Sequence, residues 1–347
     1  MIVIFSNEND LSTIDVAKRL KQMKQDVIII EPDTAENMLI GIDNEKILFK
    51  NIRTGRVFNI LNASATWWRR SGLGMKNFTK SLPDKFIVDE HDLSALIHGS
   101  KSIAFMEMND LRDYIFTTLY KHCKIKIGNP HAMSLNRLEV LDTARELGLE
   151  TPNFAVITNY NQLQNLYNIS DPFVTKAIYN GIYNVFDKIS YYTYTEAHNK
   201  ADFYDKDIPL FPSLITSFID KSYEIRSFYL EGKFYSMAIF SQSNEQTKVD
   251  FRKYSNTKPN RTEPYQLPID IETKLNTIYK KYDLNCGSAD FIVDKKGHYV
   301  FLEINPVGQF GMTSQPCNYD LEQKIANYLA SNPQPIGFSG ILLAKRQ

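Results

Sequence analysis

Short apolar runs and helical patterns alternate at the start of the chain. Residues 2–6 form an apolar run, residues 11–24 carry apolar side chains at helical spacing, and a second apolar run covers 27–30. This order predicts a βαβ unit with two parallel strands, as found at the start of open α/β sheets. The turn over 6–10 contains no glycine, so the dinucleotide-binding fingerprint is absent.

The pattern then predicts a hairpin, a strand and a long helix before a break. Residues 46–50 and 57–61 flank a turn that contains Gly55, which is typical of a hairpin. A further strand is predicted over 65–70 and helical structure over 88–122. Because Gly128-Asn129-Pro130 interrupts both kinds of pattern, we expect the first domain to cover 1–128.

Helices and strands are mixed in the remainder of the chain. The pattern predicts helices over 134–147, 161–168 and 319–330, with Gly148 as the C-cap of the first, and strands over 154–157, 172–177 and 214–219. Two hairpins are predicted, one joining 224–230 to 233–242 and one joining 287–293 to 298–304. We expect a central subdomain over 129–213, a C-terminal subdomain over 214–331 and a tail over 332–347.

Charge and composition narrow the classes of function. The 347 residues carry 40 basic and 40 acidic side chains, so no bulk field attracts nucleic acid or an anionic membrane. The three cysteines stand far apart, which argues against a disulfide framework or a zinc site. No basic segment precedes the first apolar run and no apolar stretch is long enough to span a bilayer. We therefore expect a soluble cytoplasmic protein without a nucleic-acid or membrane partner.

The last predicted hairpin gathers oxygen ligands on one face. A loop of two or four residues pairs Val293 with His298, which sets Asp290 opposite Phe301 and places Glu303 diagonally beyond it. Three side chains then project on one side: Asp290, Glu303 and Asn305. Oxygen-only ligands suit a hard cation such as Mg²⁺. A solvated strand face is the alternative, but apolar neighbours indicate partial burial, where unpaired carboxylates are costly.

Three cationic side chains are candidates for binding an anion. Lys176 lies on a predicted strand from which its ammonium could reach a phosphate, although a surface lysine gives the same pattern. Arg226 shares a strand face with Glu224 and could form only a weak ion pair, and Arg252 is equally ambiguous. Motifs for a serine nucleophile, a zinc protease and a P-loop are all absent, which excludes acyl-enzyme and zinc hydrolase chemistry.

In order along the chain, these segments resemble the ATP-grasp superfamily of carboxylate ligases. The resemblance rests on the segments around Asn136-Arg137-Leu138, Phe173 to Lys176, Ile215 to Arg226, Asp290-Phe291 and Phe301 to Gly311. Within the superfamily, the chain is most similar to maturases of ω-ester and ω-amide peptides, the microviridin type, and to the grasp-with-spasm branch. That narrower resemblance rests on Trp67-Trp68-Arg69-Arg70, Asp220 to Arg226 and Asp250 to Tyr254.

The resemblance implies an α/β (α+β) fold, in which a Rossmann-like pre-ATP-grasp domain precedes two α+β subdomains that clasp ATP. It assigns Arg137 and Lys176 to the nucleotide phosphates, Ser217, Phe218 and Ile219 to the adenine, and Glu224 to the nucleotide site. Arg226 and Arg252 become the catalytic cations, and two magnesium ions fall to Asp290, Glu303 and Asn305. The chain departs from the family pattern in two places. The family often has a lysine where this chain has Arg137, and its phosphate-covering loop is usually richer in glycine than residues 179–184 of this chain.

The implied activity is the closure of rings in a ribosomal precursor peptide. An Asp or Glu side chain attacks the γ-phosphoryl group of ATP, and a Ser or Thr hydroxyl or a Lys amine captures the acyl phosphate. A leader segment would dock on the tyrosine-rich stretch 178–207 or the 224–242 hairpin, and a homodimer is also implied. Two alternatives remain: a RimK-like ligase that adds a free amino acid, and a non-catalytic nucleotide-binding module. The sequence leaves open the number of rings and the choice of ester or amide.

Overall fold

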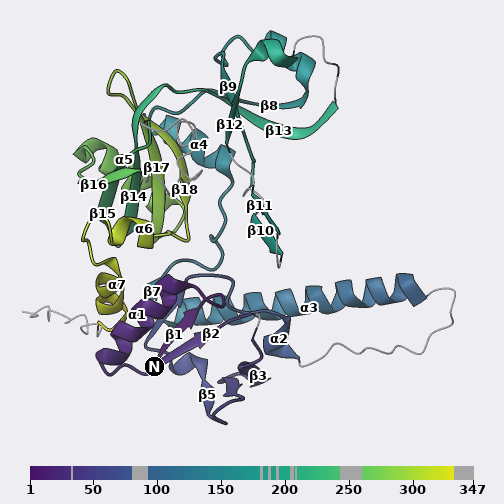
Figure 1. Ribbon diagram of the computed structural model, residues 1–347. Helices are drawn as coiled ribbons and strands as arrows, with labels where there is room; N and C mark the ends of the chain where they lie inside the picture. Colours follow the sequence, from purple (N-terminus) through teal and green to yellow (C-terminus); the bar gives the residue numbers. More distant parts are fainter. Residues whose placement is uncertain are drawn as a thin grey trace, which may run out of the picture. The chain divides into compact units, whose positions relative to one another are not determined.

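Figure 1 shows a computed structural model of the chain, which divides into two compact units. It describes residues 1–32, 34–79, 93–179, 183–186, 189–192, 195–203, 207, 209–242 and 260–331, with the side chains of 93–102, 183–186 and 189–192 outside the description. The first unit comprises Met1–Pro130 and Glu322–Gln347, and the second comprises His131–Leu321. The finer division at residues 213 and 214 stays a prediction.

A parallel sheet forms the centre of the first unit. Its strand order is β2-β1-β6-β7, and all neighbours pair in parallel. The βαβ prediction is confirmed, because helix α1 connects the two strands β1 and β2. The elements are β1 (Ile2–Phe5), α1 (Leu11–Gln22), β2 (Val27–Ile30), β6 (Ala65–Trp68) and β7 (Ile125–Ile127).

One face of this sheet packs against the long helix α3 (Leu93–His122). Val3 and Phe5 share a buried cluster with Ile115 and Phe116 of that helix. A three-stranded antiparallel sheet, of order β3-β4-β5, packs on the same cluster. The predicted hairpin is its β4-β5 pair, and β3 was not predicted. The remaining elements are β3 (Asn37–Ile42), β4 (Ile47–Asn51), β5 (Val57–Asn59), η1 (Ile60–Asn62), α2 (Met75–Phe78) and α7 (Leu321–Leu329).

The second unit contains a four-stranded antiparallel sheet of order β12-β9-β13-β8. The predicted helix over 161–168 is a 3₁₀ helix, η2, that ends at Asn165. A separate hairpin pairs β10 with β11. The elements are β8 (Phe154–Asn159), η2 (Tyr160–Asn165), β9 (Phe173–Lys176), β10 (Tyr183–Phe186), β11 (Ile189–Tyr192), β12 (Glu196–His198), η3 (Lys200–Phe203) and β13 (Pro209–Ser217).

A five-stranded antiparallel sheet of order β16-β15-β14-β17-β18 carries the main core of the second unit. Helices α4 and α5 pack against one face of this sheet, where Leu141 and Leu275 share a buried cluster with Ile225 and Phe291. The predicted hairpins are confirmed, and residues 231–232 form the tight turn of the first. The elements are α4 (Arg137–Glu146), β14 (Lys221–Leu230), β15 (Lys233–Phe240), β16 (Arg261–Tyr265), α5 (Ile269–Lys281), β17 (Cys286–Asp294), β18 (Tyr299–Asn305) and α6 (Gly311–Ser314).

The register of the last hairpin corrects the prediction. Phe291 pairs with Phe301, and both are fully buried on the core face. A bulge at Leu302 then sets Asp290 directly opposite Glu303 rather than opposite Phe301. Because one extra residue reverses the alternation of side chains, the bulge turns Glu303 onto the face that carries Asp290. The prediction that Asp290 and Glu303 share a face is therefore right, but the predicted pairing is wrong.

Candidate active site

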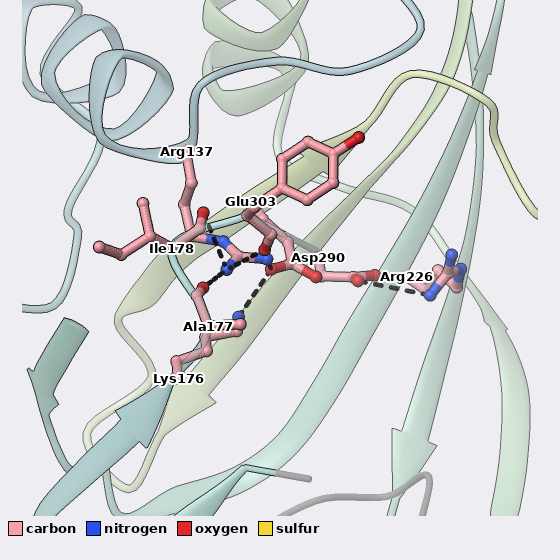
Figure 2. A network of polar contacts seen from close by, with 8 residues as sticks. Arg137, Lys176, Ala177, Ile178, Arg226, Asp290 and Glu303 are labelled. Carbon is pink, nitrogen blue, oxygen red and sulfur yellow. Dashed lines mark hydrogen bonds and ion pairs between the residues drawn. The ribbon is translucent and has the colours of Figure 1, made fainter. Parts of the chain in front are cut away.

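Glu303 accepts hydrogen bonds from two cations that come from different elements (Figure 2). Its Oε2 lies 2.9 Å from Nη2 of Arg137 and 2.7 Å from Nζ of Lys176. Arg137 is the first residue of α4, where the side chain of Asn136 caps the helix, and Lys176 is the last residue of β9. The end of a strand and the start of a helix therefore bring two positive charges to one carboxylate oxygen.

Arg137 also binds the chain that leaves β9. Its Nη1 donates to the carbonyl oxygens of three successive residues: Ala177, Ile178 at 3.5 Å and Tyr179 at 3.1 Å. Figure 2 shows the carbonyl groups of Ala177 and Ile178 turned toward the guanidinium. The two terminal nitrogens of the guanidinium let Arg137 bind this stretch and the Glu303 carboxylate together.

A second ion pair joins neighbouring strands of the same sheet. Nη1 of Arg226 on β14 lies 3.3 Å from Oδ2 of Asp290 on β17, and the two residues are register partners. The Arg226 side chain is only 7% exposed, and its buried Nε has no hydrogen-bond partner among the described residues. A buried guanidinium with unused donor capacity suits an anionic ligand.

Glu224 belongs to a buried cluster of its own. Its Oε1 accepts hydrogen bonds from Nζ of Lys221 and, at 3.0 Å, from Oγ of Ser241. Burial raises the pKa of the Glu224 carboxyl above its ordinary value, Lys221 and Ser241 oppose this effect, and the charge of Asp290 adds to it. The structure gives Glu224 a lysine partner, so its role at a nucleotide stays a prediction.

The residues predicted for adenine lie at the end of β13 and just beyond it. The backbone N–H of Ser217 donates to the carbonyl of Asn153 at 2.8 Å, and that of Phe218 donates to Oγ of Ser170 at 2.8 Å. Ile219 is half-buried in the segment that leads to β14. Ser217 ends the strand that pairs with β9, and no hydrogen bond or ion pair of the described residues joins these three residues to the Glu303 network. Arg252 lies outside the described residues.

Asp290, Glu303 and Asn305 provide the donor set that a hard divalent cation requires. Asp290 and Glu303 are direct cross-strand partners, and Asn305 pairs with Ser288 at the next position of the same face. No group of three histidine, cysteine or acidic side chains able to hold a metal occurs within the described ranges. Because Mg²⁺ in proteins is usually held by one or two carboxylates together with phosphate oxygens and water, these two carboxylates and the amide fit that ion.

The sequence-based prediction missed three features of the site. It paired Arg226 with Glu224, whereas the structure pairs Arg226 with Asp290 and Glu224 with Lys221. It also gave no hint that Arg137 binds the chain after β9. The adjacent apolar residues Phe301-Leu302, which break the alternation before Glu303, were the available signal for the bulge.

Comparison with known proteins identifies the fold. No protein-family model and no curated protein matches the chain. Among solved structures, a RiPP-associated ATP-grasp ligase from Chryseobacterium gregarium, solved with ADP and a leader and core peptide, has a TM-score of 0.72 at 22% identity over 94% of this chain and 96% of that chain. The macrocyclase MdnC from Microcystis aeruginosa, bound with precursor peptide MdnA, has a TM-score of 0.68 at 22% identity over 94% and 98%.

A more distant ligase shares the same architecture. D-alanyl-alanine synthetase A from Vibrio cholerae has a TM-score of 0.52 at 11% identity over 94% of this chain and 96% of that chain. The chain therefore has the ATP-grasp fold, which confirms the predicted fold class. Among the helices that the structure describes, none is both long and apolar enough to cross a membrane.

Proposed function

We propose that the protein is an ATP-dependent carboxylate ligase that closes rings in a ribosomal precursor peptide. The observation that carries this proposal is the convergence of Arg137, Lys176 and Arg226 with Asp290 and Glu303 on adjoining elements of one unit. Alternating cations and carboxylates are what a site for a polyphosphate and its divalent ions requires.

The chain's own residues take separate roles in this proposal. Arg137 and Lys176 bind the nucleotide phosphates, and the segment from Ser217 to Ile219 contacts the adenine through backbone groups. Arg226 and Arg252 stabilise the negative charge that develops as the phosphoryl group is transferred. Glu224, which binds Lys221 and Ser241, contributes to the nucleotide site. Two Mg²⁺ ions held by Asp290, Glu303 and Asn305 would offset the phosphate charge when bound.

The proposed reaction proceeds through an acyl phosphate. A carboxylate oxygen of an Asp or Glu side chain attacks the γ-phosphorus, the bond to the β-phosphate oxygen breaks, and ADP leaves. A Ser or Thr hydroxyl, or a Lys amine, of the same peptide then attacks the acyl carbon. The acyl–phosphate bond breaks, phosphate leaves, and the nucleophile loses its proton to solvent. Each ring therefore consumes one ATP and removes one water from the peptide.

A peptide substrate is supported by what the similar structures contain. The Chryseobacterium ligase was solved with a leader and core peptide, and MdnC with its precursor peptide. We propose that this chain likewise binds a leader segment, with the 224–242 hairpin and the 178–207 stretch as the docking surfaces. A leader supplies binding energy away from the reacting groups, which is how a ligase can act on a variable core.

Incubation with ATP, Mg²⁺ and a short peptide encoded beside the gene tests the proposal. We expect mass spectrometry to show the loss of one water for each ring and an equal release of ADP. The matched control is the same peptide with its acidic core residues replaced by Asn or Gln, which should stay unmodified. If only free amino acids provoke ADP release, the RimK-like activity replaces the peptide maturase.

We also propose a homodimer and a cytoplasmic location. Three apolar side chains of α3 are more than half exposed, Ile103, Phe105 and Met106, and such a surface gains from a second copy of the chain. All three cysteines are free and buried, which supports a reducing compartment. Light scattering of the purified protein tests the dimer, and a monomeric mass at working concentration would exclude it.

A further inference from the structure

Among the proposed metal ligands, Glu303 contacts two cationic side chains, whereas Asp290 pairs with Arg226. Arg137 and Lys176 both bind Oε2 of Glu303, within 2.9 Å and 2.7 Å. The three side chains are 15%, 21% and 24% exposed for Arg137, Lys176 and Glu303, so water screens them only in part. A divalent cation that approached this carboxylate would therefore meet two positive charges at hydrogen-bond distance from its ligand.

The two cations are mechanically linked to each other. Lys176 ends β9, and the next residues, 177–179, supply the carbonyl oxygens that Nη1 of Arg137 binds. A displacement of residues 177–179 therefore moves Lys176 and changes the hydrogen bonds of Arg137 at the same time. Neither cation belongs to β18, the strand that carries Glu303. Lys176 pairs with Leu214 of β13 through its backbone, so the lysine and arginine side chains can leave the carboxylate by rotation without breaking a strand pairing.

Asp290 shows the opposite arrangement. Its cation, Arg226, lies on the adjacent strand β14, and the two residues are held together by the sheet itself. That pair is fixed by register, whereas the contacts of Glu303 are made from outside the sheet. The site thus combines one ion pair between register partners of the sheet with two ion pairs whose cations lie outside the sheet and can bind other anions instead.

We propose that Arg137 and Lys176 close Glu303 against divalent cations until a nucleotide polyphosphate draws both cations away. The inference rests on the proposed function and deepens it, because it orders the two ligands of the same site. Phosphate oxygens compete for the arginine and the lysine, and Glu303 then becomes available to the metal. Metal affinity without nucleotide is therefore held low by the chain's own side chains.

Binding of Mn²⁺, measured by electron paramagnetic resonance of the free ion, tests this directly and needs no turnover. The wild-type chain is compared with Lys176→Gln and Arg137→Gln, each without nucleotide. We expect both variants to bind Mn²⁺ alone about tenfold or more tightly than the wild type, because each loses a unit charge beside Glu303. Addition of ADP should raise the Mn²⁺ affinity of the wild type by a larger factor than that of either variant.

Lys274→Gln is the matched control. Lys274 is a partly exposed lysine of the same unit, bound to the carbonyl of Gly148 and near Asp270, and it does not contact the site. We expect this variant to bind Mn²⁺ as the wild type does. Far-ultraviolet circular dichroism of all three variants verifies folding, and two independent variants keep the test decisive if one of them fails to fold.

The outcomes separate this inference from the proposed function. If the wild type binds Mn²⁺ alone as tightly as both variants while still binding ADP and modifying peptide, the closure is overturned and the ligase stands. If the wild type binds neither ADP nor ATP, the ligase is overturned, whereas the Mn²⁺ comparison without nucleotide still decides the closure.

Discussion

The two units of the chain each hold one carboxylate between two cations, and the comparison separates a structural cluster from a working one. In the first unit, Oδ2 of Asp10 lies 3.4 Å from Nε of Arg69 and 3.0 Å from Nε of Arg70. In the second unit, Oε2 of Glu303 receives Arg137 and Lys176 at similar distances. The same charge pattern therefore occurs twice, in different surroundings.

The surroundings decide what each cluster can do. Asp10 is 7% exposed, and its other oxygen caps α1 by accepting from the backbone N–H of Thr13 at 2.9 Å. Burial by itself would raise the pKa of Asp10, but Arg69, the Thr13 N–H and Arg70 together hold that pKa below the ordinary value. The contacts of Asp10 therefore stabilise the folded first unit. Glu303, in contrast, is 24% exposed, and its cations come from elements outside its sheet.

The sharpest test of this contrast is Glu303→Gln. Loss of the carboxylate charge should reduce ATP consumption by about a hundredfold or more, because a metal ligand and the transition-state charge it serves are lost together. Stability should fall by only about 1 kcal/mol, since its partners are partly exposed. ADP release and thermal unfolding measure the two effects.

A matched control for this variant is Glu263→Gln. Glu263 lies on β16 of the same sheet, is 52% exposed and forms a surface ion pair with Arg261. Its activity and melting temperature should equal those of the wild type. Normal turnover by Glu303→Gln would remove Glu303 from the metal site.

Asp10→Ala should show the reverse pattern, with a large effect on stability. It removes both a buried ion-pair partner and a helix N-cap, and we expect the first unit to lose about 3 kcal/mol of unfolding free energy. Asp10→Asn keeps a capping oxygen and should lose about 1 kcal/mol less. Urea unfolding followed by tryptophan fluorescence reports on the first unit alone, because the chain's two tryptophans are Trp67 and Trp68.

If Asp10→Ala and the wild type have equal unfolding free energies, the Asp10 cluster stabilises the fold no more than the Glu303 cluster does. Equal stability of the Ala and Asn variants would show that the ion pairs, and not the cap, supply the effect.

Local periodicity predicted α4 and the strands that carry the candidate site, but it missed α5, β16 and the strands β10 to β12, and it could not fix the register of β18. Alternating apolar residues indicate which face a strand buries, and a bulge changes that assignment from one residue onward. Phe301 pairs with Phe291 on the core face, and the bulge at Leu302 turns Glu303 onto the face of Asp290. The sequence-based register reached the right face for Glu303 through the wrong partner, since two errors in parity cancelled.

The candidate site was predicted as a set of residues and not as a set of pairs. Arg137, Lys176 and Glu303 are separated by 39 and 127 positions in the chain, and only tertiary packing decides which cation meets which carboxylate. The same holds for Lys221, which neutralises Glu224 within the sheet and so leaves Arg226 to Asp290. Residue types and spacing carry the chemistry, whereas the pairings are a property of the fold.

The pH dependence of stability gives the smallest expected effect and the finest test of the Asp10 cluster. The folded-state pKa of Asp10 is lowered, so its stabilisation is fully present above the unfolded pKa of about 3.9 and is lost as the pH falls through the folded value. Wild type and Asp10→Asn should therefore differ by a constant amount from pH 7 to about 5 and converge below about 4. Urea unfolding with tryptophan fluorescence over this range measures the difference. A gap that persists unchanged well below the folded pKa would mean that contacts other than the carboxylate charge distinguish aspartate from asparagine at this position.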